Sequence, residues 1–209
     1  MKKWIFSFII LLSFAISIFG QEFTINGNRY YKKENGSSVS IYKNEDVILV
    51  VNNLKSFVVS NNESSIAYTT LENDGSMRLY KNGQLYATTK DMFINPSLSP
   101  DGNKLYYFEV KYGSNNSLLF YVRGPDIPPA ISGPYLKPYG YGTFIFSNDS
   151  RYMACHVESF TPGMTGFYFF LNNRLLGPYR STSRNFNFSD DSSQFIFTRN
   201  GSEEIINLK

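Results

Sequence analysis

The sequence predicts an all-β fold, a β-propeller of about five four-stranded antiparallel blades. Three observations predict it: a repeat with a period near 43 residues, Asn-Gly and Asp-Gly turns between short apolar runs, and no sustained helical periodicity after residue 21. The 209 residues are 42% hydrophobic and 17% aromatic, so the chain has enough apolar surface to form a core rather than stay disordered.

The repeat consists of an aromatic or aliphatic residue, a serine, a turn of Pro, Asn or Asp residues, and a short apolar strand. Its serines are Ser60, Ser99, Ser147 and Ser189, which lie 39, 48 and 42 residues apart. Four-stranded propeller blades have repeats of about this length. In the unit between residues 55 and 89, strands are expected at Ser56–Ser60, Ser64–Leu71, Met77–Lys81 and Gln84–Thr89.

The number of blades follows from the two ends of the chain. Residues 22–53 form a further unit without the serine turn, and residues 186–209 form a last unit of three strands. An N-terminal strand at Glu22–Asn26 would complete that last blade and close a five-bladed ring. The alternative is an incomplete ring, an open arc that closes by pairing with another chain, because unpaired strand edges attract partners.

The N-terminus has the pattern of a secretory signal peptide. Met1-Lys2-Lys3 is followed by an uncharged run from Trp4 to Phe19 and then Gly20. We therefore expect a signal peptide at residues 1–20 and a repeat domain at residues 21–209, in an exported protein that is periplasmic or secreted. Cleavage after Ser17 also fits the small-residue rule. An uncleaved run would be the protein's link to a membrane.

Charge and composition restrict the partners and cofactors. Without residues 1–20 the chain has 18 Lys and Arg against 17 Asp and Glu, which argues against nucleic acid as a partner. One Cys and one His exclude a disulfide framework and leave little for a zinc site, so we expect no metal and no cofactor. The chain contains no Gly-x-Ser-x-Gly, phosphate-loop or His-Glu-x-x-His motif, and we assign no catalytic residue.

Two sets of residues have reactive side chains, but a structural role explains their positions better than a catalytic one. Cys155 and His156 are adjacent on an expected strand, so they point to opposite faces and cannot form a nucleophile–base pair. The repeat places Cys155 at a core position. Asp101, Asp149 and Asp191 recur at one place in each unit, where a carboxylate accepts hydrogen bonds from backbone N–H groups of the turn. The other interpretation is a ring of acids at a channel mouth.

A proline-rich segment is the candidate binding region. Five of the nine prolines lie between residues 125 and 138, so the segment cannot be a regular strand throughout. We expect Tyr135, Tyr139 and Tyr141 to offer flat amphipathic faces to a partner. The alternative is that these tyrosines pack on the blade below.

One copy of the repeat carries a family resemblance. Ser99-Pro100-Asp101-Gly102-Asn103-Lys104 and the strand after it resemble the Ser-Pro-Asp-Gly-Lys turns of TolB-type, WD-repeat-like β-propeller proteins. The resemblance covers roughly residues 55–199, with one close copy and three degenerate ones, and implies an envelope protein as partner.

We therefore expect an exported, non-enzymatic propeller that binds a protein or another component of the cell envelope. The alternative is a hydrolase or lyase that acts on glycans or peptides, with paired acids at the propeller mouth. A third interpretation is a structural module held at the membrane by an uncleaved N-terminal run.

Overall fold

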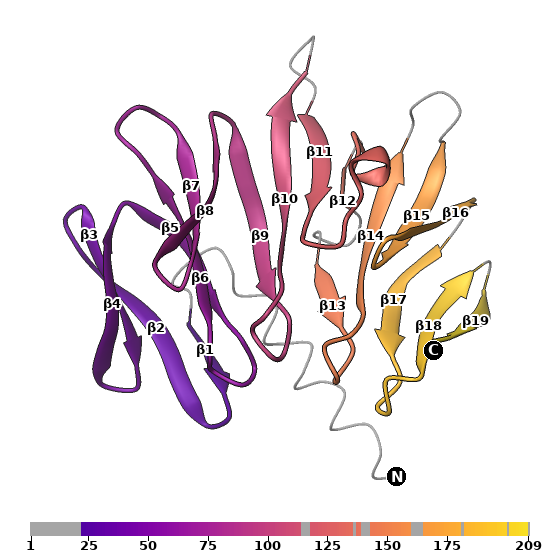
Figure 1. The fold of residues 1–209 in the computed structure, drawn as a ribbon, viewed down its shortest axis with the longest axis horizontal. Coiled ribbons are helices and arrows are strands. Elements are labelled where there is room, and N and C mark those ends of the chain that lie inside the picture. Colours follow the sequence, from indigo (N-terminus) through magenta and orange to yellow (C-terminus); the bar gives the residue numbers. More distant parts are fainter. Residues whose placement is uncertain are drawn as a thin grey trace.

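The computed structural model describes residues 22–113, 118–135, 137–138, 143–159, 165–180, 182–199 and 201–208. Five antiparallel sheets follow one another along the chain and stand in a row (Figure 1). The expected all-β propeller architecture is confirmed. The only helical element of the described residues is a short 3-10 turn at Pro129–Ile131. No described helix has the length and hydrophobicity needed to cross a membrane. The expected signal peptide lies outside the described residues.

The first and second sheets each contain four strands. Those of the first are β1 (Glu22–Ile25), β2 (Asn28–Asn35), β3 (Ser38–Lys43) and β4 (Asp46–Asn52). Those of the second are β5 (Leu54–Val59), β6 (Ile66–Leu71), β7 (Met77–Lys81) and β8 (Gln84–Thr89).

The third sheet contains β9 (Met92–Leu98), β10 (Leu105–Tyr112) and β11 (Leu118–Arg123). The fourth contains β12 (Lys137–Pro138), β13 (Phe144–Phe146), β14 (Met153–Ser159), β15 (Gly166–Leu171) and β16 (Arg174–Tyr179). The fifth contains β17 (Thr182–Phe188), β18 (Gln194–Arg199) and β19 (Ser202–Asn207).

One strand assignment from the sequence is wrong. The strand at the N-terminus does not complete the last blade, because Glu22–Ile25 pairs with β2 and belongs to the first sheet. The reason is local. Asn26 and Gly27 both have positive φ (48° and 80°), which is the geometry of a two-residue hairpin turn that returns the chain at once. The last sheet therefore has three strands within the described residues.

An asparagine turn sets the register of three sheets. Asn44, Asn82 and Asn172 have φ between 50° and 57°, and each lies between the last two strands of its sheet. The Asn82 side chain accepts from the N–H of Ile66 (2.9 Å), and the Asn82 N–H donates to the Ile66 carbonyl (2.8 Å). Asn44 with Arg29 and Asn172 with Met153 repeat this exchange. Arg29, Ile66 and Met153 are therefore equivalent positions.

The third sheet has only a remnant of a fourth strand. Tyr135 exchanges two backbone hydrogen bonds with Phe120 on β11 (2.8 and 2.9 Å). Gly133-Pro134-Tyr135 is thereby equivalent to Gly177-Pro178-Tyr179, which ends β16 of the fourth sheet. A Cβ at Gly133 would lie 2.7 Å from the Phe120 carbonyl oxygen, so the close approach requires glycine. The prolines of this segment prevent a longer ladder because they lack the N–H donor.

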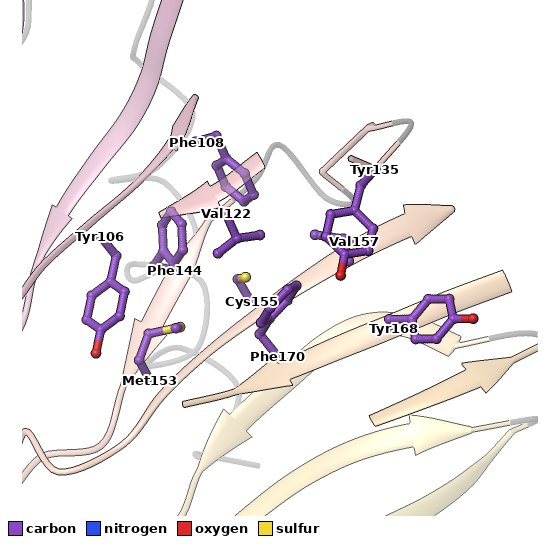
Figure 2. Packing of buried hydrophobic residues seen from close by; sticks show 10 residues of the cluster. All are labelled: Tyr106, Phe108, Val122, Tyr135, Phe144, Met153, Cys155, Val157, Tyr168 and Phe170. Carbon is purple, nitrogen blue, oxygen red and sulfur yellow. The ribbon is translucent and has the colours of Figure 1, made fainter. Parts of the chain in front are cut away.

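The core is divided into four clusters, each between two successive sheets. Members from the two sides are Tyr30 and Phe57, Leu79 and Leu105, Phe108 and Phe144, and Phe169 and Phe197. Figure 2 shows the cluster between the third and fourth sheets, where Cys155 lies among larger apolar side chains. Five sheets with four such interfaces form an open row, in which the first and fifth sheets stand at opposite ends (Figure 1).

Candidate binding site

The serine of each repeat closes the turn between the first two strands of its sheet. Ser99 Oγ donates to Asp101 Oδ1 (2.5 Å) and accepts from the backbone N–H of Lys104 (2.9 Å). The serines of the other units repeat this pattern, with the acceptors Asn62, Asp149 and Asp191. The turn role expected for the recurring aspartates is confirmed.

These carboxylates are stabilised in the ionised form. Hydrogen bonds from the Ser189 hydroxyl and from the N–H and hydroxyl of Ser193 lower the pKa of Asp191 to about 2. A carboxyl group with such a low pKa is not a proton donor at neutral pH.

The turns are also connected to one another across the sheets, and we call this line of contacts the turn belt. Asn62 Nδ2 donates to the Asp101 carbonyl (2.9 Å), which joins the second and third sheets. The Asp101 N–H donates to Ser150 Oγ (3.0 Å), which joins the third and fourth. Asn26 to Asn61 and Asn148 to Asp190 complete the belt over all five sheets.

Cys155 and His156 occupy opposite faces of β14, as the sequence predicts. Cys155 is fully buried between the third and fourth sheets, and burial raises the pKa of its thiol well above the usual value. The His156 ring stacks on Phe169 (centroids 4.2 Å apart) and its Nε2 lies 2.9 Å from Thr182 Oγ1 of the fifth sheet. Burial lowers the pKa of His156 to about 4, so the ring is neutral at pH 7. Both residues pack in the core.

Of the three candidate binding tyrosines, Tyr135 is the one that the structure describes. Tyr135 is 1% exposed in the cluster between the third and fourth sheets, and its hydroxyl donates to the Ile131 carbonyl (2.5 Å). This is the packing arrangement that the sequence also allowed. Tyr139 and Tyr141 lie outside the described residues.

The register of the fourth sheet gives the pairing of the described residues on either side of these two tyrosines. Pro138 pairs with Val157 and Phe144 pairs with Cys155, so the chain between the two pairs is four residues longer than the strand opposite. The first strand of this sheet is thus described in two parts, which pair with β14 on either side of His156, and β12 is the part toward the C-terminal end of β14.

A cleft of about 430 Å³ lies at that end of the fourth sheet. Glu158 at the end of β14, the beginning of β15 and the end of β16 form its walls. Its lining residues are Glu158, Thr165, Gly166, Phe167, Pro178, Tyr179 and Arg180. The cleft thus combines one acid and one base with apolar surfaces, a combination that suits recognition of an amphipathic ligand.

The two charged groups of the cleft differ in exposure. Glu158 is 7% exposed, whereas Arg180 is exposed at the rim. The Tyr179 ring is half-buried, with the Arg199 guanidinium 5.4 Å from its centroid and the Phe197 ring 5.5 Å away. Packing against the fifth sheet therefore fixes one wall of the cleft, and Arg180 is the more exposed of its two charged groups.

A second cleft, of about 380 Å³, lies at the opposite end of the same sheet. Tyr152, the asparagine turn at Asn172 and Arg174 form its walls, together with Asn207 and Leu208 of the fifth sheet. Each cleft therefore has one exposed arginine, so a variant of Arg174 is a matched control for the same variant of Arg180.

Neither cleft contains a pair of carboxylates among its described lining residues. Over the described part of the chain, no three His, Cys, Asp or Glu side chains gather in a way that could hold a metal ion. The described lining of the cleft at Glu158 therefore offers one carboxyl group, one guanidinium group and apolar walls.

No protein-family model and no curated protein sequence matches the chain. Among solved structures, the β-propeller domain of the Trilobed protease from Pyrococcus furiosus is 11% identical with a TM-score of 0.49, over 85% of this chain and 63% of that one. Pyrococcus horikoshii acylaminoacyl peptidase is 10% identical with a TM-score of 0.49, over 92% of this chain and 39% of that one. TolB from Acinetobacter baumannii is 17% identical with a TM-score of 0.41, over 86% and 49%. The chain spans between 39% and 63% of these three proteins.

The sequence analysis missed the cleft and the recurrence of the asparagine turn in three sheets. The turn has a visible signal, since Asn44, Asn82 and Asn172 each follow an aromatic residue by two positions. The cleft has none, because it brings together the ends of three strands that are separated by turns of variable length.

Proposed function

We propose that this protein is an exported, non-enzymatic propeller module of the TolB type, and that it binds a protein of the cell envelope. The cleft at Glu158 and Arg180 is the observation that carries the proposal, because it is the described site with apolar walls and two opposite charges. Hydrophobic walls supply affinity and the charges select the partner's orientation. The apolar N-terminal run supports export to the periplasm or beyond.

The described strand that precedes Tyr139 in the chain pairs with β14 beside the cleft. β12, which ends at Pro138 just before Tyr139, pairs with β14 at Val157 and Glu158. We therefore propose that Tyr139 and Tyr141 contribute to the surface around the cleft. Tyrosines are frequent in protein interfaces because their rings bury large areas with little loss of side-chain entropy.

The experiment is chemical crosslinking of the tagged full chain in intact cells, followed by mass spectrometry. We expect one dominant envelope protein, and at least a tenfold loss of its capture when Arg180→Glu reverses the charge at the cleft. Tyr139→Ala with Tyr141→Ala should give a loss of similar size. Arg174→Glu, an equally exposed change in the opposite cleft, is the matched control and should leave capture unchanged. Equal losses for both arginine variants would remove the cleft from the proposal.

Glu158 favours one second candidate, a hydrolase or lyase for glycans or peptides. Its carboxyl group is 7% exposed and lines the cleft, where it would contact a bound substrate. Turnover of a glycan or peptide substrate that Glu158→Gln abolishes, with the fold intact by circular dichroism, would establish this candidate and refute the binding proposal. Capture of a partner without turnover supports the binding module.

A further inference from the structure

The first sheet exposes a face of aromatic and apolar side chains. Tyr31 and Tyr42 stack on this face with centroids 5.0 Å apart and an interplanar angle of 5°. Val50 is 57% and Ile48 is 43% exposed beside them on β4. Lys33 lies over both tyrosine rings, 5.5 and 4.8 Å from their centroids. We call this set, together with Arg29, the outward face of the first sheet.

The same aromatic pair exists in the second sheet, where another sheet covers it. The asparagine turn makes Tyr31 equivalent to Tyr68 and Tyr42 equivalent to Tyr80. Tyr68 and Tyr80 also stack, with centroids 5.0 Å apart, but Tyr68 is 5% exposed because the first sheet packs on it. Tyr31 is in the same position at the end of the row and is only half-buried.

The fifth sheet also has an exposed face, and it is the face that packs on the following sheet in the second, third and fourth sheets. The serine turns make Ile196 equivalent to Ala67, Tyr106 and Ala154, each of which is 0% exposed against the sheet that follows. Ile196 itself is only half-buried, and its cross-strand partner Ile205 is 50% exposed. We call Ile196, Thr198, Glu203 and Ile205 the outward face of the fifth sheet.

Every interface in the row joins these two kinds of face. In the second sheet, Ala67 packs toward the third sheet and Tyr68 toward the first, and the other two interfaces use equivalent positions. The outward faces of the first and fifth sheets are therefore of the two kinds that pack on each other. They stand at opposite ends of the row (Figure 1), so these five sheets do not bring them together in one chain.

We propose that the outward face of the fifth sheet of one chain packs on the outward face of the first sheet of a second copy, head to tail. The contact would continue the packing of the four existing interfaces, and both faces carry exposed aliphatic side chains for it. Charge also matches: Lys33 adds a positive charge to one face and Glu203 a negative charge to the other. The inference is independent of the cleft and its partner.

The test is site-specific crosslinking between two single-cysteine additions. Val50→Cys and Ile205→Cys place one thiol on each face in separate chains, while Cys155 is buried and does not compete. The full chain is expressed with its own N-terminal segment, and the purified variants are mixed and treated with a short bismaleimide. We expect a covalent dimer in the mixture and not in either variant alone. Leu85→Cys, 57% exposed like Val50, replaces Val50→Cys in the control mixture and should give at least tenfold less dimer.

A charge exchange makes the test specific. Lys33→Glu added to the Val50→Cys chain should reduce the dimer several-fold, and Glu203→Lys added to the Ile205→Cys chain should restore it. The proposal is overturned if the mixture gives no more dimer than the Leu85→Cys control. It is also overturned if Val50→Cys alone forms the dimer, which would mean that two first sheets meet, or if a chain with both cysteines gives only an internally linked monomer.

Discussion

The backbone N–H of Asp101 donates a hydrogen bond of 3.0 Å to the hydroxyl of Ser150, 49 residues further along the chain. Asp101 belongs to the serine turn of the third sheet and Ser150 to that of the fourth. Similar contacts connect the other turns, so polar groups at one rim align five sheets whose apolar faces pack without directional bonds. The turn belt is therefore expected to fix how successive sheets are placed against each other.

The Ser150 hydroxyl should be measurable as a stabilising group. Ser150 is 7% exposed, and Ser150→Ala leaves the Asp101 N–H without its acceptor. We expect a loss of about 1–2 kcal/mol in the free energy of unfolding, measured by urea denaturation. Ser97→Ala is the control, because within the described part of the chain the Ser97 hydroxyl bonds only to the Asn95 carbonyl two residues away, and it should cost less than about 0.5 kcal/mol. Equal losses would show that the contact between sheets adds nothing.

Gly102 tests the same belt through its packing. Gly102 has φ +73°, and a Cβ there would lie 2.6 Å from Ser64 Oγ and 2.8 Å from Ser65 Oγ of the neighbouring turn. Gly75 has φ +78° with nothing within 4 Å of its Cβ position, so Gly75→Ala pays for the backbone conformation alone, about 1 kcal/mol. Gly102→Ala should cost about 1–2 kcal/mol more by urea denaturation. A difference below about 0.5 kcal/mol would contradict close packing of the turns.

His156 should make the protein less stable in mild acid. Its pKa is about 4 in the folded chain and near 6.5 when unfolded, so the unfolded state takes up a proton first as the pH falls. The contribution of His156 to the free energy of unfolding should therefore be fully present above pH 6.5. It should fall by about 3 kcal/mol in total as the pH decreases toward 4. The measurement is urea denaturation at pH 7.0 and 4.5.

The matched variant for that experiment is His156→Phe. Phe108 occupies the equivalent position in the third sheet, so a phenyl ring suits the site, although the bond to Thr182 is lost. The difference in stability between the native chain and the variant should shrink or reverse between pH 7.0 and 4.5. An unchanged difference would mean that His156 takes up its proton equally in the folded and unfolded states.

Cys155 should react with thiol reagents only when the protein unfolds. The side chain is 0% exposed between the third and fourth sheets, and burial raises the pKa of its thiol. With increasing urea, the rate of modification by a chromogenic disulfide should rise over the same range as the loss of circular dichroism. Rapid modification in the absence of urea would contradict the packing shown in Figure 2.

Local signals explain which parts of the fold the sequence predicts. The strands Met77–Lys81 and Gln84–Thr89 form at the predicted residues because Asn82-Gly83 defines the turn between them. The serine turns are likewise complete within six residues. The prediction for the N-terminal strand is wrong because ring closure favours the last sheet, whereas the Asn26-Gly27 hairpin pairs Glu22–Ile25 with β2.

The candidate site was harder to predict, for physical reasons. An aromatic residue in a proline-rich segment can face solvent or the core, and Tyr135 faces the core because its backbone pairs with Phe120. The cleft depends on Glu158 and Arg180, which are 22 residues apart and line the same cleft because β15 pairs with β14 and β16 pairs with β15. Contacts of that kind depend on the arrangement of whole strands and leave no pattern in the neighbouring residues.

Photo-crosslinking from the cleft tests the proposed binding role most directly. A photoreactive amino acid replaces Thr165, an exposed lining residue of the cleft with Glu158, or Asn173, an exposed lining residue of the opposite cleft. Irradiation of intact cells should give an adduct with one envelope protein from position 165 and none from position 173. No adduct from position 165, or the same adducts from both positions, would contradict a binding module that uses this cleft.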